Sequence, residues 1–253
     1  MAKPASSGPR VIFYDIETAP SLGYFFDKYK ENNIVATVQD WFLLSFAYKV
    51  RGEKKIHYHC LADYPGYEKN PIDDKALATD LHRLIFSNAD LLIGHNLDKF
   101  DGRKSRSRFL AYGLPPTPPI KTIDTLKIAR RVFKQDSNRL ADIGQYLGLG
   151  GKVTHTGWAM WQACINGDRK AWAQMGRYNK RDVDLLEKVY DKLAPWHPNP
   201  PVLMNGDRCP SPTCGSFNVQ RRGWNLARKS RTARMQCQSC AQWFSGNREA
   251  IKA

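Results

Sequence analysis

Runs of apolar residues predict strands in the first part of the chain. Residues 11–20 (VIFYDIETAP), 41–50 (WFLLSFAYKV), 54–61 (KKIHYHCL) and 91–96 (LLIGHN) contain the β-branched and aromatic residues that favour strands. The polar residues 51–53 (RGE) predict a turn between the second and third runs. These two strands are therefore expected to form an antiparallel hairpin.

Helical periodicity dominates the later part of the chain. Helices are expected over 71–90, with Asp73 or Asp74 as cap, and over 137–151, with Ser137 or Asn138 near the cap. Residues 120–133 read as a short strand that runs into a helix. A long helix over 168–193 directs six side chains to a core: Trp172, Met175, Val183, Leu186, Val189 and Leu193. Antiparallel strands followed by alternating strands and helices predict an α/β fold with a mixed sheet flanked by helices.

Four prolines in 194–203 (APWHPNPPVL) indicate a linker between a large and a small domain. The expected division is an N-terminal tail at 1–9, a main domain at 10–194 and a Pro-rich linker at 195–204. A small domain at 205–246 and a C-terminal tail at 247–253 complete it.

The charge balance favours a polyanionic partner. The chain of 253 residues has 39 Lys and Arg against 24 Asp and Glu, a formal net charge of +15, which suits nucleic acid. No stretch is long and apolar enough to span a membrane, and the first residues lack the apolar segment of a secretory signal. A cytoplasmic protein without membrane contact is expected.

Acidic residues gather at the ends of predicted strands and on the last helix. Asp15 and Glu17 alternate along the first strand and so face the same side, where they repel each other unless a cation lies between them. A second acidic cluster is 94–101 (GHNLDKFD), and in the third Tyr178 and Asp182 share one helix face. Each feature alone is ordinary, as a solvated helix face or a cap. Together they predict a metal site.

The order D-x-E, N-x3-F-D, Y-x3-D over residues 10–194 resembles the DEDD family of 3′-5′ exonucleases, which has the ribonuclease H-like fold. The tyrosine matches the branch called DEDDy. The resemblance implies phosphodiester hydrolysis with two Mg²⁺ or Mn²⁺ ions, and the residues implied as their ligands are Asp15, Glu17, Asp101 and Asp182. It also implies that Tyr178 orients the attacking water and that the backbone from Ile16 to Thr18 receives the terminal nucleotide.

The segment after Asp101, GRKSRSRFL, departs from the family pattern because no apolar residue appears before Phe109. Gly102 disfavours a helix by about 1 kcal/mol relative to Ala, so we expect Asp101 to be held less firmly. The same segment offers four basic side chains to the phosphates of a substrate strand: Arg103, Lys104, Arg106 and Arg108.

Three neighbouring polar residues are given supporting roles. Asn96 is expected to fix the loop that presents Asp101. His95 is read as a hydrogen-bonding residue at a strand end, and Asp124 is either an outer partner of the site or purely structural.

Two cysteine pairs near the C-terminus, CPSPTC and CQSC, predict a zinc ribbon with one structural Zn²⁺. The expected ligands are Cys209, Cys214, Cys237 and Cys240. Cys60 and Cys164 are expected to be small buried residues instead.

Basic and aromatic residues alternate around these cysteines and predict a nucleic-acid grip. The basic residues are Arg221, Arg222, Arg228, Lys229, Arg231 and Arg234. The aromatic residues are Phe217, Trp224, Trp243 and Phe244, about half of which are expected to fill the core of the ribbon.

The leading hypothesis is a metal-dependent 3′-5′ exonuclease on DNA, preferably on single-stranded ends, that acts in trans in replication or repair in a phage or bacterial setting. DNA is favoured over RNA. One alternative is a nucleic-acid-binding protein with a decayed exonuclease domain. Another is an RNA-trimming or endonucleolytic relative.

Overall fold

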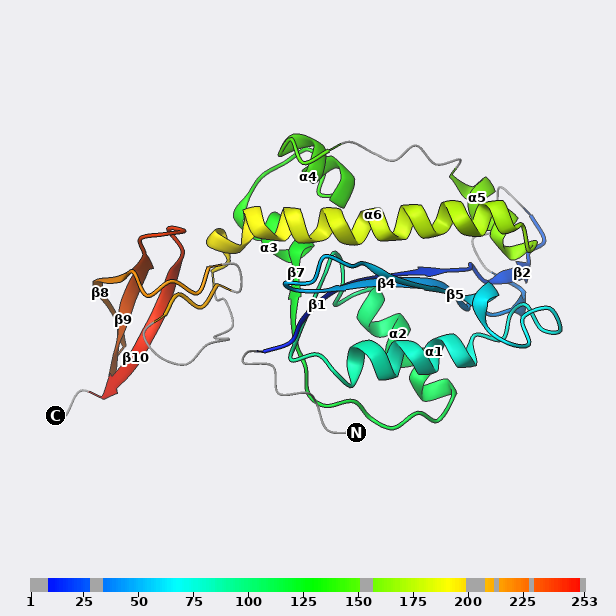
Figure 1. The fold of residues 1–253 in the computed structure, drawn as a ribbon, viewed down its shortest axis with the longest axis horizontal. Helices are drawn as coiled ribbons and strands as arrows, with labels where there is room; N and C mark the ends of the chain where they lie inside the picture. The colour runs from blue at the N-terminus through cyan, green and yellow to red at the C-terminus, as the bar shows by residue number, and fades with distance from the viewer. Residues whose placement is uncertain are drawn as a thin grey trace.

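The structure, a computed structural model, describes residues 9–27, 34–150, 157–198, 208–211, 214–227 and 230–250. Its centre is a five-stranded sheet in the order β5-β4-β1-β6-β7 (Figure 1). These strands are β1 Val11–Thr18, β4 Leu43–Val50, β5 His57–Cys60, β6 Leu91–Gly94 and β7 Lys121–Asp124.

The sheet is mixed, as predicted. β4 pairs antiparallel with β1 and with β5, which confirms the hairpin, whereas β6 runs parallel to β1 and to β7. Because β1, β6 and β7 are parallel, the loops that follow them leave from the same end of the sheet. The acidic residues at the ends of β1 and β6 are thereby brought to one region.

Helices cover both faces of the sheet (Figure 1). α6 (Arg169–Leu193) crosses one face, while α1 (Lys75–Leu81) and α2 (Asp101–Ala111) lie on the other. All six predicted core residues of α6 are at most 5% exposed. The remaining helices are η1 Leu61–Asp63, a π-helical turn η2 His82–Phe86, α3 Thr125–Val132, α4 Leu140–Tyr146, α5 Trp158–Ile165 and η3 Ala194–Trp196.

Strand alternation directs the acidic residues of β1 toward α6. Phe13 packs against Tyr190 of α6, with ring centroids 5.8 Å apart. Asp15 and Glu17 follow at the alternate positions and so point to the same side as Phe13. Ile12, Tyr14 and Ile16 instead join the cluster that contains the buried leucines of α1.

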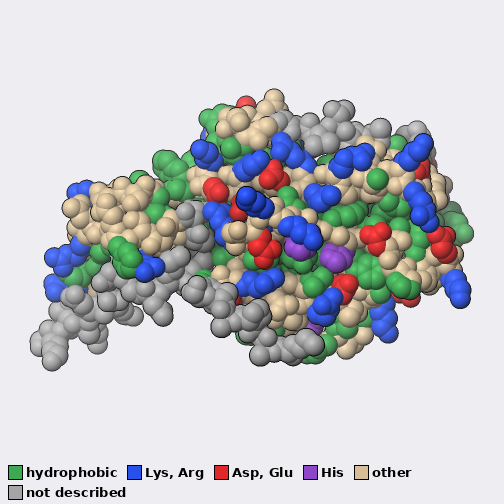
Figure 2. All heavy atoms as spheres, in the orientation of Figure 1, with side chains coloured by type: hydrophobic (Ala, Val, Ile, Leu, Met, Phe, Trp, Pro, Cys, Tyr) green, Lys and Arg blue, Asp and Glu red, His purple; other side chains and the backbone are tan. Residues whose placement is uncertain are grey.

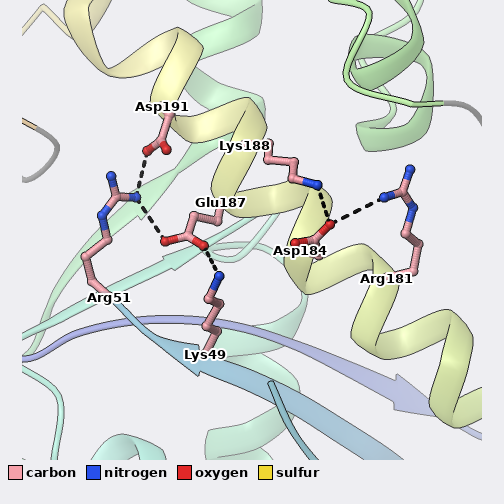
Figure 3. Close-up of polar contacts among 7 residues, drawn as sticks. All are labelled: Lys49, Arg51, Arg181, Asp184, Glu187, Lys188 and Asp191. Carbon is pink, nitrogen blue, oxygen red and sulfur yellow. Dashed lines mark hydrogen bonds and ion pairs between the residues drawn. The ribbon is translucent and has the colours of Figure 1, made fainter. Parts of the chain in front are cut away.

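Ion pairs link α6 to β4 (Figure 3). The Lys49 Nζ lies 2.5 Å from Glu187, and Arg51 reaches both Glu187 at 3.2 Å and Asp191 at 2.6 Å. Because Lys49 and Glu187 are only about 15% exposed, water screens this contact less than a surface pair. These contacts help to fix α6 over the sheet.

Three elements, β2, β3 and α5, were not predicted from the sequence. β2 (Leu22–Tyr24) and β3 (Ala36–Gln39) form a small antiparallel hairpin, and α5 precedes α6. Each is short, so its periodicity is too brief to recognise.

A second sheet, in the order β10-β9-β8, lies beyond the C-terminal end of α6 (Figure 1). Its antiparallel strands are β8 Val219–Ala227, β9 Ser230–Cys237 and β10 Trp243–Ala250. β10 therefore runs past the expected domain boundary at residue 246, because its last residues pair with β9. The expected N-terminal tail and Pro-rich linker fall mostly outside the described residues.

Asp74 forms a buried node rather than the expected helix cap. Its carboxylate is fully buried, accepts a hydrogen bond from the Leu43 backbone N–H at 2.6 Å, and pairs with Arg108 and with the Tyr112 hydroxyl. Asp73 instead accepts a hydrogen bond from the Lys75 N–H at 3.0 Å. Asp74 thus ties β4, α1 and α2 together.

Replacing Asp74 with Ala should destabilise the domain by about 3 kcal/mol or more, because it leaves the largely buried Arg108 charge without its partner. The free energy of unfolding, measured by urea denaturation, tests this. Its exposed neighbour supplies the control, since Asp73→Ala removes only a capping hydrogen bond and should cost about 1 kcal/mol. Equal losses in the two variants would contradict the buried node.

Candidate active site

Three acidic residues from two elements meet above the sheet. Asp15 and Glu17 at the end of β1 and Asp182 on α6 each offer an oxygen atom within 4.8 Å of the others. All three side chains are half-buried. Within the described residues, no Lys or Arg forms an ion pair with Asp15 or Glu17. The negative charges of these two acids are therefore not neutralised by a basic side chain of the described residues.

Asp101 lies beside this group, at the start of α2. It is 3% exposed, and its Oδ1 accepts a hydrogen bond from the Ile16 backbone N–H at 3.2 Å. Its charge acts on both Asp15 and Glu17, although it is not one of the three residues within 4.8 Å. The Ile16 N–H is therefore already hydrogen-bonded within the protein.

The expectation that Asp101 is loosely held is wrong. α2 turns small residues to the core in place of an apolar stripe, and both Gly102 and Ser105 are buried. The Ser105 hydroxyl donates to the Asp101 carbonyl at 2.7 Å, and a Cβ at position 102 would lie only 3.0 Å from the carbonyl oxygen of Leu97. Gly102 therefore allows the close approach that holds Asp101 in place.

The acids raise one another's pKa. Burial, followed by the charges of the neighbouring acids, holds the pKa of both Asp15 and Glu17 well above the usual range. Burial raises the pKa of Asp101 to about 7, although the Ile16 N–H opposes this shift. Ionising the whole cluster is therefore unfavourable unless a cation compensates it.

Two aromatic side chains border the acids. Burial and the Asp182 charge raise the pKa of Tyr178, whose hydroxyl is hydrogen-bonded to Asp182. Trp161 of α5 is hydrogen-bonded to Glu17, and its ring meets that of Tyr178 nearly edge-on at 5.8 Å. Trp161 was not expected at the site from the sequence, because α5 was not predicted.

The loop between β6 and α2 is held by the supporting residues. Asn96 adopts a left-handed backbone conformation with φ 65°, and its N–H donates to Asp124 Oδ1 at 2.9 Å. Asp124 also accepts from the N–H groups of Asp98 and Leu126, so its role is to fasten this loop and cap α3. His95 is hydrogen-bonded to Thr125 Oγ1 and to the Asn138 carbonyl, both at 2.9 Å, as expected of a strand-end residue.

A groove of about 320 Å³ adjoins the acids. Thr18, the residue that follows Glu17 in the sequence, lines one wall of the groove. The Lys104 Nζ, also at the groove, lies 3.7 Å from the ring centroid of Trp41. The lining residues are Thr18, Ala19, Pro20, Ser21, Trp41, Lys104, Trp158 and Trp161. Three indole rings and one ammonium group thus surround a hollow next to the carboxylates.

The four basic residues of α2 do not form one surface. Lys104 lines the groove, while Arg103 and Arg106 are exposed, with Arg106 donating to the Gly102 carbonyl at 3.1 Å. Arg108 is bound to Asp74 within the protein. Its guanidinium is therefore committed to the fold.

The four predicted zinc ligands come together in the ribbon, the region of residues 208–250 that contains the second sheet, and only Cys237 lies within a strand. The sulfur atoms of Cys209, Cys214, Cys237 and Cys240 all lie within 4.8 Å of one another. Two of the separations are 3.6 and 3.7 Å, close to the roughly 3.8 Å between sulfurs that a tetrahedral Zn–S distance of about 2.3 Å gives. Cys60 and Cys164 are buried elsewhere, as predicted.

The four aromatic residues of the ribbon differ in exposure. Phe217 and Trp243 are exposed, whereas Trp224 and Phe244 are half-buried, so two of the four are partly covered by the ribbon. Trp224 lies 5.0 Å from the Arg221 guanidinium and 4.2 Å from that of Arg231. Arg222 donates to Gln238 at 3.4 Å. Arg228 and Lys229 lie outside the described residues.

Basic side chains are spread over the molecule. Figure 2 shows Lys and Arg side chains along α6, where acids lie among them, and further basic side chains on the ribbon, where no acid is in view. No helix in the described part of the chain combines the length and apolar character needed to cross a membrane.

Without added Mg²⁺ or Mn²⁺, the stability of the protein should fall as the pH rises from about 4 to about 7. An unfolded Asp has a pKa near 4, whereas burial raises that of folded Asp101 to about 7. Between these values the folded state binds more protons, so raising the pH favours unfolding. In urea denaturation across this range, the free energy of unfolding of Asp101→Asn should depend less on pH than that of the wild type.

The matched control is Asp136→Asn, at an exposed site outside the cluster, which should keep the wild-type profile. A stability that rises steadily up to pH 7 in the wild type would contradict this account.

Comparison with known proteins supports the fold. A family profile described as the RNase H superfamily matches residues 12–194. A solved structure of the family B DNA polymerase from the hyperthermophilic archaeon Pyrobaculum calidifontis has a TM-score of 0.50 with 15% sequence identity. The match covers 74% of this chain but only 25% of the polymerase. No curated protein matches the sequence. The sheet order, the flanking helices and the profile match over most of the chain establish that the protein belongs to the RNase H superfamily.

Proposed function

We propose that this protein is a metal-dependent 3′-5′ exonuclease of the DEDDy type that degrades DNA from unpaired ends. The observation that carries the proposal is the meeting of Asp15, Glu17 and Asp182 within 4.8 Å, with the Tyr178 hydroxyl hydrogen-bonded to Asp182. The order of the sequence motifs supports the direction of cleavage, since it resembles that of the DEDDy exonucleases. The fold likeness to a DNA polymerase supports DNA over RNA as substrate.

The donor set of the acidic cluster fits hard divalent cations. It offers carboxylate oxygens only, which Mg²⁺ and Mn²⁺ prefer, and no Lys or Arg of the described part of the chain forms an ion pair with Asp15 or Glu17. Asp15, Glu17, Asp101 and Asp182 would hold the ions. When bound, two such ions supply Lewis acidity, lowering the pKa of an attacking water and stabilising the leaving 3′ oxygen.

The surrounding residues would position water and substrate. Because its pKa is raised, Tyr178 stays a neutral phenol at neutral pH, so it can orient a water molecule but cannot act as the general base. Trp161 holds Glu17 through a hydrogen bond and borders Tyr178. Thr18 begins the wall of the adjoining groove, next to the metal ligand Glu17.

The groove suits an unpaired nucleotide. Base–indole stacking contributes about 1–3 kcal/mol per base, and a base in a duplex cannot stack in this way without leaving its partner. Lys104 supplies a positive charge for a phosphate. Arg103 and Arg106 are exposed and extend this charge along α2, whereas Arg108 is left out because Asp74 binds it.

The ribbon would add a second contact to nucleic acid. Its four cysteines would hold one structural Zn²⁺, since the sulfur separations match a closed tetrahedral site. Trp224 between Arg221 and Arg231 presents an aromatic face flanked by two cations, the combination that binds bases and phosphates. Exposed Arg222 lies on the same strand.

Activity on 5′-labelled single-stranded DNA with Mg²⁺ or Mn²⁺ tests the proposal. The protein should produce a ladder that shortens from the 3′ end. Asp15→Ala and Asp182→Ala should each lower the rate at least about 100-fold, because a lost ligand costs more than a lost outer partner. Asp136→Ala, an exposed acid outside the cluster, should keep the wild-type rate.

If the protein binds the labelled DNA but does not shorten it, the exonuclease proposal is wrong and a nucleic-acid-binding protein with a decayed exonuclease domain is favoured. Internal cuts, or faster cleavage of RNA, would favour the endonucleolytic or RNA-trimming relative.

The ribbon contact predicts a change in salt dependence. Combining Arg221→Ala with Arg231→Ala should weaken single-stranded DNA binding and flatten its dependence on log salt concentration by about 0.7 per lost phosphate contact. Fluorescence anisotropy of labelled DNA measures both effects. Arg130→Ala with Arg131→Ala removes the same charge at exposed sites on α3, so equal losses in the two double variants would argue for net charge alone.

A further inference from the structure

A buried amide connects β4, α6 and the first acid of the cluster. Asn179 of α6 is completely buried, and its Nδ2 donates to Asp15 Oδ2 at 2.6 Å. The same amino group lies 3.5 Å from the Asp15 carbonyl. On the other side, the hydroxyl of fully buried Ser45 donates to Asn179 Oδ1 at 3.3 Å.

The chemistry of these groups fixes which group donates and which accepts in each of these hydrogen bonds. An ionised carboxylate only accepts hydrogen bonds, so the amide must turn its NH₂ to Asp15 and its carbonyl to Ser45. The Ser45 hydroxyl can donate to that carbonyl. Each member of the series Ser45–Asn179–Asp15 is therefore satisfied in one orientation only.

The backbone places all three residues without strain. Ser45 pairs with Glu17 across β4 and β1, so both side chains point to the face that α6 covers. Asn179 follows Tyr178 directly on α6 and lies almost one turn before Asp182. One amide thus sets where the acid on β1 lies relative to Tyr178 and Asp182 on α6.

A buried Lys or Arg side chain at position 179 could also hold the Asp15 carboxylate, but its positive charge would compete with a metal ion for that carboxylate. Asn179 carries no charge, so it holds the Asp15 carboxylate without neutralising it. Burying an amide is costly unless both of its ends are hydrogen-bonded, and here both ends are. A plain packing role would be served as well by Leu, which has nearly the same shape.

We propose that Asn179, supported by Ser45, is a positioning residue that fixes the Asp15 carboxylate for divalent-cation binding. The inference deepens the proposed function, because it assigns a determinant of metal affinity at the same site. The inference rests on the proposed function in one respect only, namely that the site binds a divalent metal ion.

Mn²⁺ binding to the full-length, zinc-loaded protein tests the role without a nuclease assay. Titration followed by the electron paramagnetic resonance of free Mn²⁺ gives the dissociation constant. Asn179→Leu should raise it on the order of 10-fold, as losses of outer-shell partners do, and Ser45→Ala should raise it by less. The thermal midpoint of each variant is measured alongside.

The matched control is Val189→Ala, which opens a cavity on the buried face of α6 but removes no polar contact. It should lower the thermal midpoint and leave Mn²⁺ affinity unchanged. Wild-type affinity in Asn179→Leu, or a loss in Val189→Ala as large as that in Asn179→Leu, would overturn the positioning role.

The outcomes separate this role from the proposed function. If wild type binds Mn²⁺ and Asn179→Leu binds it as well, the metal site stands and the positioning role fails. If Asn179→Leu binds weakly while wild type cleaves no nucleic acid, the positioning role stands and the exonuclease fails. Absence of Mn²⁺ binding in wild type, judged against Asp15→Ala, would remove both.

Discussion

Mutual repulsion among carboxylates is the constraint around which the main domain is arranged. Asp15, Glu17 and Asp182 are half-buried within 4.8 Å of one another, and burial and their charges raise the pKa of the two acids on β1. Such a cluster destabilises the folded state when it is ionised and no cation is present. The rest of the domain must therefore hold these groups together. A local loss of stability of this kind is a familiar pattern at functional sites.

Small and neutral side chains make this close arrangement possible. Gly102 lets α2 approach the loop that ends β6, and Gly176 lets α6 approach the edge strand, since a Cβ there would lie 2.9 Å from the Tyr58 ring. Asn179 and Ser105 satisfy polar groups that large apolar residues would leave unpaired. The ion pairs of Lys49 and Arg51 with α6 involve Glu187 and Asp191, which lie farther along the helix than Asp182. Packing and electrostatics thus support the same geometry.

The ribbon solves a different problem, because it is too small to fold around a core. The buried residues described there are mainly Cys209, Cys237, Ser211, Ser230 and Gln242, whereas none of its four described aromatic side chains is fully buried. A metal bound by four thiolates can replace the missing apolar core. Its aromatic and arginine side chains are then available on the outside, where they pair as in the contact of Trp224 with Arg231. The metal site proposed for the ribbon is structural, whereas the one proposed for the main domain is chemical.

The elements with long periodicity could be read from the amino-acid sequence, together with the acids that lie on them. β1, β4, β5 and α6 were predictable because alternation and helical spacing extend over enough residues, and motif order then indicated that Asp15, Glu17 and Asp182 belong to one site. The partners of the polar residues, in contrast, follow from the folded structure alone. Arg108 is bound to Asp74, and Asn179 and Trp161 hold Asp15 and Glu17. Such pairs join residues far apart in the chain, as Asn179 and Asp15 are, and no local pattern encodes a contact that exists only when the helix lies on the sheet.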